Sequence, residues 1–145
     1  MSRISIYKEE ILKIYTDGAA RGNPGPAAYA FLLVYKDEII HQGSGYIGNT
    51  TNNTAEYHAV INALKAAEKF HKGHLQIFSD SNLVVNQINK KWKIHYRHLS
   101  ELCSKVNQLR QKYEEVEFFH ATRTNTYIQK CDELCNSQLD KKGFK

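Results

Sequence analysis

The chain has 145 residues, of which 41% are hydrophobic, and this length and composition favour one domain over residues 1–145 with its own core. Its net charge of +5 favours an anionic partner. Nucleic acid fits better than a membrane surface, because no segment is both long and amphipathic with a wholly basic face. Residues 1–10 lack the apolar core of a signal peptide, so we expect a cytoplasmic protein with no membrane partner.

The first third of the chain predicts three strands. Residues 11–16 are almost continuously apolar, which is typical of a strand in the centre of a sheet. Residues 21–26 contain two glycines and two prolines, so we expect neither a helix nor a strand to cross them. Residues 27–35 and 38–46 are strand-like segments separated by a short polar break, which indicates an antiparallel hairpin.

The remaining chain predicts alternating helices and strands. The polar residues 48–54 supply cap residues for a helix that continues to about Phe70, with Gly73 as its stop. The sequence then predicts a strand at 75–79, a helix at 81–88, a helix through Leu99 and Leu109, a strand at 116–119 and a helix at about 128–139. This order predicts an α/β fold with a five-stranded mixed sheet, in which an antiparallel hairpin adjoins parallel strands and helices cover both faces.

Four carboxylates occupy positions that suit a metal site. Asp17 and Asp80 each end a strand-like run, whereas Glu56 and Asp132 each lie in the first turns of a helix-like segment. Ligands of such sheets settle outside the carboxyl ends of the strands, where Asp17 and Asp80 are expected. Like charges raise one another's pKa unless a cation neutralises them, so convergence of the four would indicate bound metal.

Cysteine and histidine residues predict little chemistry. Cys103, Cys131 and Cys135 are too few and too scattered for a disulfide framework, and we expect reduced, packed thiols. Cys131 and Cys135 are four apart on an expected helix, which leaves a metal site as an alternative, but no second pair at ligand spacing completes it. His71 and His74 flank the helix stop and are expected to be solvated.

Four motifs follow one another along the chain: Tyr-Thr-Asp-Gly at residues 15–18 with Gly-Asn-Pro-Gly-Pro at 22–26, Thr-Thr-Asn-Asn-Thr-Ala-Glu at 50–56, Ser-Asp-Ser-Asn at 79–82 and Lys-Cys-Asp-Glu-Leu at 130–134. In this order they closely resemble ribonuclease H of type 1. The resemblance implies a ribonuclease H-like fold. It also implies an endonuclease that cleaves the RNA strand of RNA/DNA hybrids and leaves 5′-phosphate and 3′-hydroxyl ends.

The resemblance assigns metal binding to Asp17, Glu56, Asp80 and Asp132, with Asp17 bridging two Mg²⁺ ions. Two ions about 3.5–4 Å apart can activate water, relieve charge on the phosphate and stabilise the leaving oxygen. Carboxylate oxygens suit Mg²⁺, and also Mn²⁺.

The resemblance also implies contacts with the hybrid. Residues near the first aspartate would read the RNA 2′-hydroxyls, two asparagines would lie in the minor groove and a threonine would bind a DNA phosphate. The residues that would read the 2′-hydroxyls are Gly18, Ala19 and Asn23. The minor-groove asparagines are Asn52 and Asn82, and the threonine is Thr51. For Asn52 and its neighbours, a role as simple helix caps is an equal alternative.

Two features depart from the family pattern. Many members carry a histidine in the loop before the last aspartate, but residues 121–125 contain none, which makes Arg123 the first candidate for that role and His120 the second. The interval from Asn89 to Arg97 is too short for the extra basic helix of some members.

A basic cluster in that interval, Lys91, Trp92 and Lys93, is the candidate substitute for the missing helix. Its alternative is a solvated face with a partly buried tryptophan.

Two other functions compete with hybrid cleavage: a non-catalytic nucleic-acid-binding module of the same fold, and a related phosphoryl-transfer nuclease. The complete set of four carboxylates favours a catalytic chain, which we expect to be monomeric.

Overall fold

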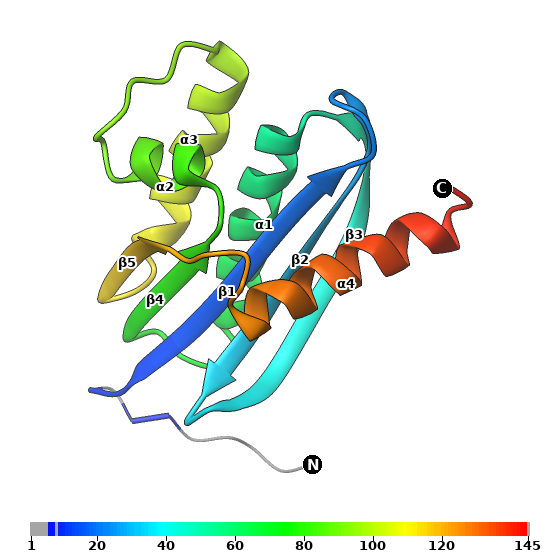
Figure 1. Ribbon diagram of the computed structural model, residues 1–145. Coiled ribbons are helices and arrows are strands. Elements are labelled where there is room, and N and C mark those ends of the chain that lie inside the picture. Colours follow the sequence, from blue (N-terminus) through cyan, green and yellow to red (C-terminus); the bar gives the residue numbers. More distant parts are fainter. Residues whose placement is uncertain (1–5, 8, 145) are drawn as a thin grey trace.

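The computed structural model describes residues 6–7 and 9–144, so most of the opening segment considered above lies outside it. The described residues form the nine expected elements (Figure 1). In chain order these are β1 (Ile11–Ala20), β2 (Gly25–Tyr35), β3 (Glu38–Thr50), α1 (Asn52–Ala67), β4 (His74–Ser79), α2 (Asn82–Ile88), α3 (Arg97–Arg110), β5 (Glu115–His120) and α4 (Thr126–Lys141).

The five strands form one mixed sheet in the order β3-β2-β1-β4-β5, which confirms the expected architecture. β1 pairs antiparallel with β2 and parallel with β4, so it is central as its apolar sequence predicted. Lys36 and Asp37 connect β2 to β3, and their positive φ angles of 51° and 66° give the backbone twist that tight hairpins need.

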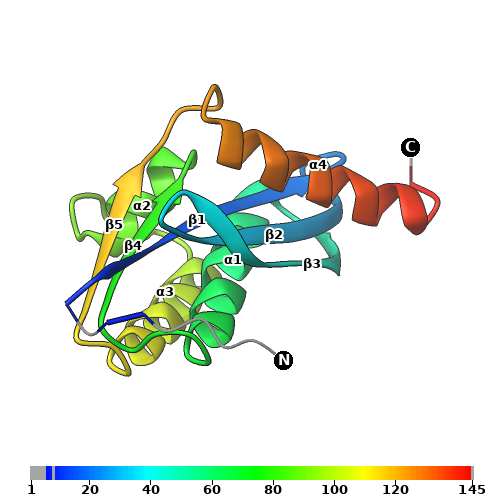
Figure 2. The same ribbon diagram turned by 90° about the horizontal axis from the view of Figure 1, so that it is seen from below.

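Helices cover the two faces unequally. In Figure 2, α4 lies on one side of the sheet, above β1, β2 and β3, while α1 and α3 lie on the other side. The larger core lies between the sheet and α1 and α3, through residues such as Leu64 and Val106. The smaller core lies under α4, where Cys131 and Cys135 are buried free thiols. The prediction of packed thiols is therefore confirmed.

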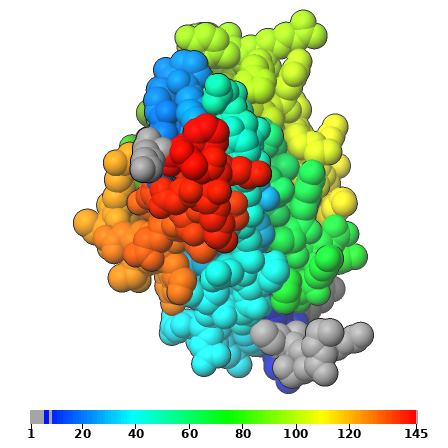
Figure 3. Space-filling view, turned by 90° about the vertical axis from the view of Figure 1, so that its right-hand side faces the viewer, coloured from blue at the N-terminus to red at the C-terminus, as the bar shows by residue number. Residues whose placement is uncertain are grey.

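The loop between β1 and β2 is fastened to the end of α4. Arg21 forms an ion pair with Asp140 at 2.8 Å and hydrogen bonds with Asn136 and with the Phe144 carbonyl. Figure 3 shows this loop, in blue, beside the end of α4, in red.

No helix among the described residues is long and apolar enough to span a membrane.

Several expectations about boundaries and exposure were wrong. β1 does not end at Thr16: its parallel pairing with β4 stops there, but its antiparallel pairing with β2 continues through Asp17 to Ala20. β2 begins at Gly25, inside the stretch expected to be irregular, because β3 pairs with it there. His71 is buried rather than solvated, and its Nε2 donates to the Glu10 carbonyl at 2.8 Å.

Candidate active site

Three of the four singled-out carboxylates converge at the carboxyl end of the parallel strands. Asp17 comes from β1, Glu56 from the second turn of α1 and Asp80 from the residue after β4. One oxygen of each lies within 4.8 Å of the others. Because β1 and β4 run parallel as neighbours, residues that follow their last paired positions meet at the same edge of the sheet.

Asp132 reaches the same pocket from α4. The pocket has a volume of about 470 Å³, and Asp132 lines it together with the three clustered carboxylates. Asp132 itself is exposed and is not part of the group within 4.8 Å. The site therefore has a buried acidic centre with one carboxylate at its solvent side.

A close contact between β1 and α1 places Glu56 beside Asp17. The Gly18 amide donates to Glu56 Oε1 at 2.6 Å. A Cβ atom at residue 18 would lie 2.2 Å from the carbonyl carbon of Ala55, so only glycine allows the strand to approach the helix this closely. The Thr51 side chain caps α1 by accepting from the Thr54 amide at 3.2 Å, which fixes where the helix begins.

The electrostatics of the clustered carboxylates are unfavourable without a cation. Burial, followed by the charges of Asp80 and Asp132, raises the pKa of Asp17 from 3.8 to about 8. Burial, followed by the charges of Asp17 and Asp80, raises the pKa of Glu56 well above its ordinary value. Asp80 Oδ1 is buried and has no hydrogen-bond partner among the described residues. A bound divalent ion would satisfy this oxygen and neutralise the group.

The sequence is similar to that of known proteins. Residues 9–139 match the family model of RNase H. The chain belongs to the RNase H family. It is 37% identical over 127 residues to ribonuclease HI of Halobacterium salinarum. The aligned region covers 87% of this chain but only 63% of that protein. It is 33% identical to a ribonuclease H of Caldanaerobacter subterraneus, with 91% of this chain and 93% of that protein covered.

Solved RNase H structures resemble this fold closely. RNase H1 of Halobacterium salinarum superimposes with a TM-score of 0.86 at 35% identity, over 91% of this chain and 99% of that one. LC11-RNase H1, solved in complex with an RNA/DNA hybrid, gives 0.84 at 35% identity, over 90% and 98% of the two chains. The ribonuclease H-like fold expected from the motifs is therefore confirmed.

Three of the five residues expected to contact the RNA 2′-hydroxyls or the minor groove lie at the acidic pocket. Gly18, Ala19 and Asn52 line it. The Asn52 side chain accepts from the Ala20 amide at 2.9 Å, and the Asn23 side chain accepts from the Asn52 amide at 3.0 Å. These contacts tie the β1–β2 loop to the start of α1. The N-cap of α1 is Thr51, whereas Asn52, Asn53 and Thr54 lie inside the helix, so the alternative that these three residues serve only as helix caps is wrong.

The basic cluster of Lys91, Trp92 and Lys93 forms a second surface. Lys91, Trp92 and Lys93 line a neighbouring pocket together with Asn53, which also lines the acidic pocket. Trp92 is 50% exposed, so half of its side chain is accessible to a partner, and both contact with the hybrid and a solvated face remain compatible with its position. Asn82 lies outside both pockets but begins α2 directly after Ser81, which lines the acidic one.

Two features of the pocket were not anticipated. Arg123 Nε lies 3.3 Å from Asp80 Oδ2, although the Arg123 side chain is 91% exposed. Gln129 also lines the pocket, three residues before Asp132 on the same face of α4. The three-residue spacing was a usable signal for Gln129, whereas the pairing of Arg123 with Asp80 required the tertiary fold.

Proposed function

We propose that this chain is an endoribonuclease that hydrolyses the RNA strand of RNA/DNA hybrids and leaves 5′-phosphate and 3′-hydroxyl ends. The observation that carries the proposal is the cluster of Asp17, Glu56 and Asp80, whose oxygens lie within 4.8 Å of one another in a member of the RNase H family. A structurally similar RNase H1, 35% identical, was solved with an RNA/DNA hybrid, which supports the choice of substrate.

The donor set fits hard divalent cations. Every candidate ligand is a carboxylate oxygen, two of the groups have raised pKa values and one buried oxygen lacks a partner. Asp17, Glu56, Asp80 and Asp132 would hold two Mg²⁺ or Mn²⁺ ions, and the family resemblance would make Asp17 the shared ligand. When bound, such ions supply an activated water and stabilise the charge on the phosphate and the leaving oxygen.

The chain's own groups would position the hybrid. Gly18 and Ala19 bring backbone close to the pocket, where it can contact the 2′-hydroxyls that distinguish RNA from DNA. Thr51 and the amides at the start of α1 would hold a DNA phosphate. Lys91 and Lys93 would contact the backbone electrostatically, and the exposed Trp92 ring offers a surface for stacking.

The test compares end-labelled RNA/DNA hybrid, DNA duplex and RNA duplex, each with Mg²⁺, Mn²⁺ or EDTA. We expect cleavage of the hybrid with either metal and none with EDTA. The matched variant is Asp17→Asn, which removes the charge of the shared ligand and should abolish turnover while hybrid binding persists. Cleavage by a folded Asp17→Asn protein within tenfold of wild type would sink the assignment. Hybrid binding without cleavage by the wild type would identify a binding module instead.

A further inference from the structure

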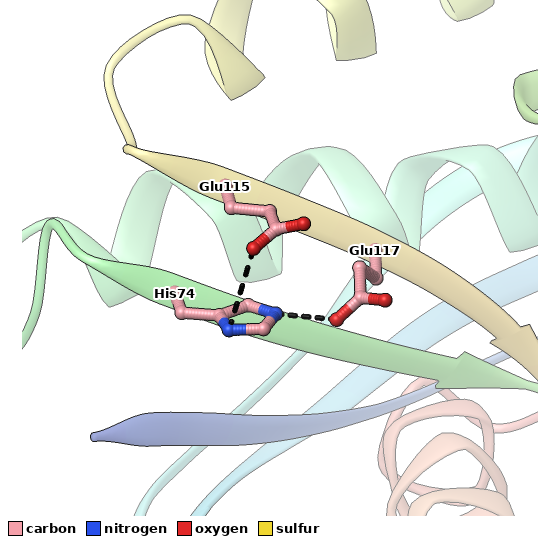
Figure 4. Close-up of side chains that lie close together, drawn as sticks. All are labelled: His74, Glu115 and Glu117. Atoms are coloured by element: carbon pink, nitrogen blue, oxygen red, sulfur yellow. Dashed lines mark hydrogen bonds and ion pairs between the residues drawn. The ribbon is translucent and has the colours of Figure 1, made fainter. Parts of the chain in front are cut away.

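A second cluster of metal-ligating side chains lies at the opposite end of the parallel strands. It consists of His74 at the start of β4 and Glu115 and Glu117 at the start of β5 (Figure 4). His74 and Asp80 are six residues apart along an extended chain, which separates the cluster from the acidic pocket by about 20 Å. The acidic pocket and its proposed chemistry therefore do not account for this cluster.

Strand register places the three side chains on one face. His74 is the Cα partner of Glu115, and Gln76 is the partner of Glu117. Alternate residues of a strand point to the same side, so the cluster shares a face with Gln76. α4 covers this face over β1, β2 and β3, and no helix of the described residues covers it over β4 and β5 (Figure 2).

The side chains are already oriented toward one another. His74 Nε2 is hydrogen-bonded to Glu117 Oε1, and His74 Nδ1 lies 3.6 Å from Glu115 Oε2. The His74 side chain is only 24% exposed, contrary to the expectation that it is solvated. Gln76 Nε2 also donates to Glu117 Oε1 at 3.3 Å. Gln76 thus orients Glu117 from outside the cluster, as supporting residues do at metal sites.

We propose that His74, Glu115 and Glu117 bind one divalent transition-metal ion, with Zn²⁺ as the representative ion. One imidazole nitrogen and two carboxylate oxygens are a donor set that Zn²⁺ accepts, with water completing the coordination. Ligand atoms bonded to one ion at about 2.0–2.2 Å lie no more than about 4.4 Å apart. The present atoms lie within 4.8 Å of one another, so only small side-chain movements are needed.

Charge and exposure favour the same assignment. Hydrogen bonds from His74 and then Gln76 lower the pKa of Glu117, which keeps this carboxylate ionised at neutral pH. With a neutral His74, the two glutamates carry two negative charges that a divalent ion would balance. Glu115 and Glu117 are 61% and 37% exposed, so both can adjust without disturbing the core. The bound ion would join β5, an edge strand, to β4.

The test is a titration of ZnCl₂ into the full chain, followed by calorimetry and by the ring proton signals of the histidines. Excess Mg²⁺ is present to occupy the acidic pocket. The variants are His74→Gln and Glu117→Gln, with His95→Gln as the matched control because His95 is exposed and outside the cluster. We expect the wild type and His95→Gln to bind Zn²⁺ alike, and the two cluster variants to bind at least tenfold more weakly.

Three readings decide the outcome. In the wild type, Zn²⁺ should shift or broaden the His74 ring signals, and this reading does not require any variant to fold. Unmoved His74 signals, or unchanged affinity in a folded His74→Gln protein, would mean that the cluster is only an ion-paired triad and would overturn the proposal. Hybrid cleavage in Mg²⁺ should be the same for His74→Gln and wild type, which separates this site from the proposed activity.

Discussion

Individual carboxylates in the acidic pocket hold their charge at a cost in stability. Asp17 is 5% exposed and Glu56 is 8% exposed, and each lies near other negative groups. In the metal-free protein such a carboxyl binds its proton more tightly when folded than when unfolded. The stability of the metal-free protein should therefore fall as pH rises. The charge that metal binding needs should thus lower stability at the same residue.

The first prediction is that Asp17→Asn stabilises the metal-free protein at high pH. The pKa of Asp17 is about 8 in the folded protein and 3.8 ordinarily. Protonated Asp17 therefore contributes to the stability of the fold at acidic pH, and this contribution is lost as pH rises from about 4 to about 8. At about 1.4 kcal/mol per pKa unit, the upper limit of the gain is about 6 kcal/mol at pH 9. Urea unfolding in EDTA measures it.

The control for this experiment is Asp37→Asn, at an exposed turn position that asparagine also tolerates. It should leave stability nearly unchanged. The gain from Asp17→Asn should shrink steadily between pH 9 and pH 5. An equal gain at both pH values would show that the charge of Asp17 is not its cause.

Arg123 carries the second prediction. Its guanidinium lies 3.3 Å from Asp80 Oδ2 and is otherwise exposed, so it can stabilise negative charge at the pocket but cannot transfer a proton. We expect Arg123→Ala to lower kcat by about ten- to a hundredfold, or about 1.4 to 2.7 kcal/mol of barrier, and Arg123→Lys to recover part of it. Single-turnover and steady-state cleavage of one hybrid measure the effect.

His120→Ala is the companion variant for Arg123, because His120 ends β5 next to the loop that bears Arg123. If His120→Ala is crippled and Arg123→Ala is unaffected, then the arginine assignment is wrong. The histidine would then hold the role from the end of the last strand.

At the scale of elements, the site depends on how closely β1 approaches α1. The Gly18 amide binds Glu56, and the β1–β2 loop is joined to the start of α1 through Asn23 and Asn52. Strand and helix thus position two carboxylates as one unit. A change that separates the two elements should affect several pocket residues together, even though it alters no ligand.

The third prediction is that Gly18→Ala damages both stability and cleavage. The new methyl group would lie 2.2 Å from the Ala55 backbone, which cannot rotate away as a side chain can. Overpacking of this kind costs about 1–3 kcal/mol. Thermal unfolding and hybrid cleavage measure the two effects. Wild-type behaviour in both assays would show that α1 can shift without loss and that the contact does not position Glu56.

At the scale of the whole molecule, the net positive charge is moderate, and the acidic and basic groups lie on different surfaces. The net charge of +5 coexists with an acidic pocket, so attraction of a polyanion must come from basic residues away from the clustered carboxylates. Lys91 and Lys93 are exposed at the neighbouring pocket that Asn53 connects to the acidic one. We therefore expect long-range attraction and metal binding to occur at adjacent but different surfaces.

The fourth prediction concerns the salt dependence of hybrid binding. Because the charge excess is modest, we expect a shallow slope of log affinity against log salt, with about −0.9 per neutralised phosphate. Lys91→Ala and Lys93→Ala should each make the slope shallower by up to about that amount. Lys69→Ala, just beyond the end of α1, is the control and should leave the slope unchanged. If all three variants match the wild type, the basic cluster is a solvated face.

Local patterns in the sequence determined the elements and the family of this protein. Hydrophobic spacing, the turn at Lys36 and Asp37 and the cap residues before α1 act over a few residues, so they predicted every strand and helix. The four motifs likewise indicated the acidic pocket, because each contains its carboxylate in a recognisable local context.

Tertiary structure alone decided the features that join distant residues. β1 continues past Thr16 because β2 supplies its hydrogen bonds, and Gly18 reaches Glu56 across 38 residues of sequence. His74 meets Glu117, 43 residues away, because β4 and β5 are parallel neighbours in a fixed register. Local propensity carries no information about such pairs. These pairs form when the strands assemble into the sheet and the cores on its two faces fix which strands lie side by side.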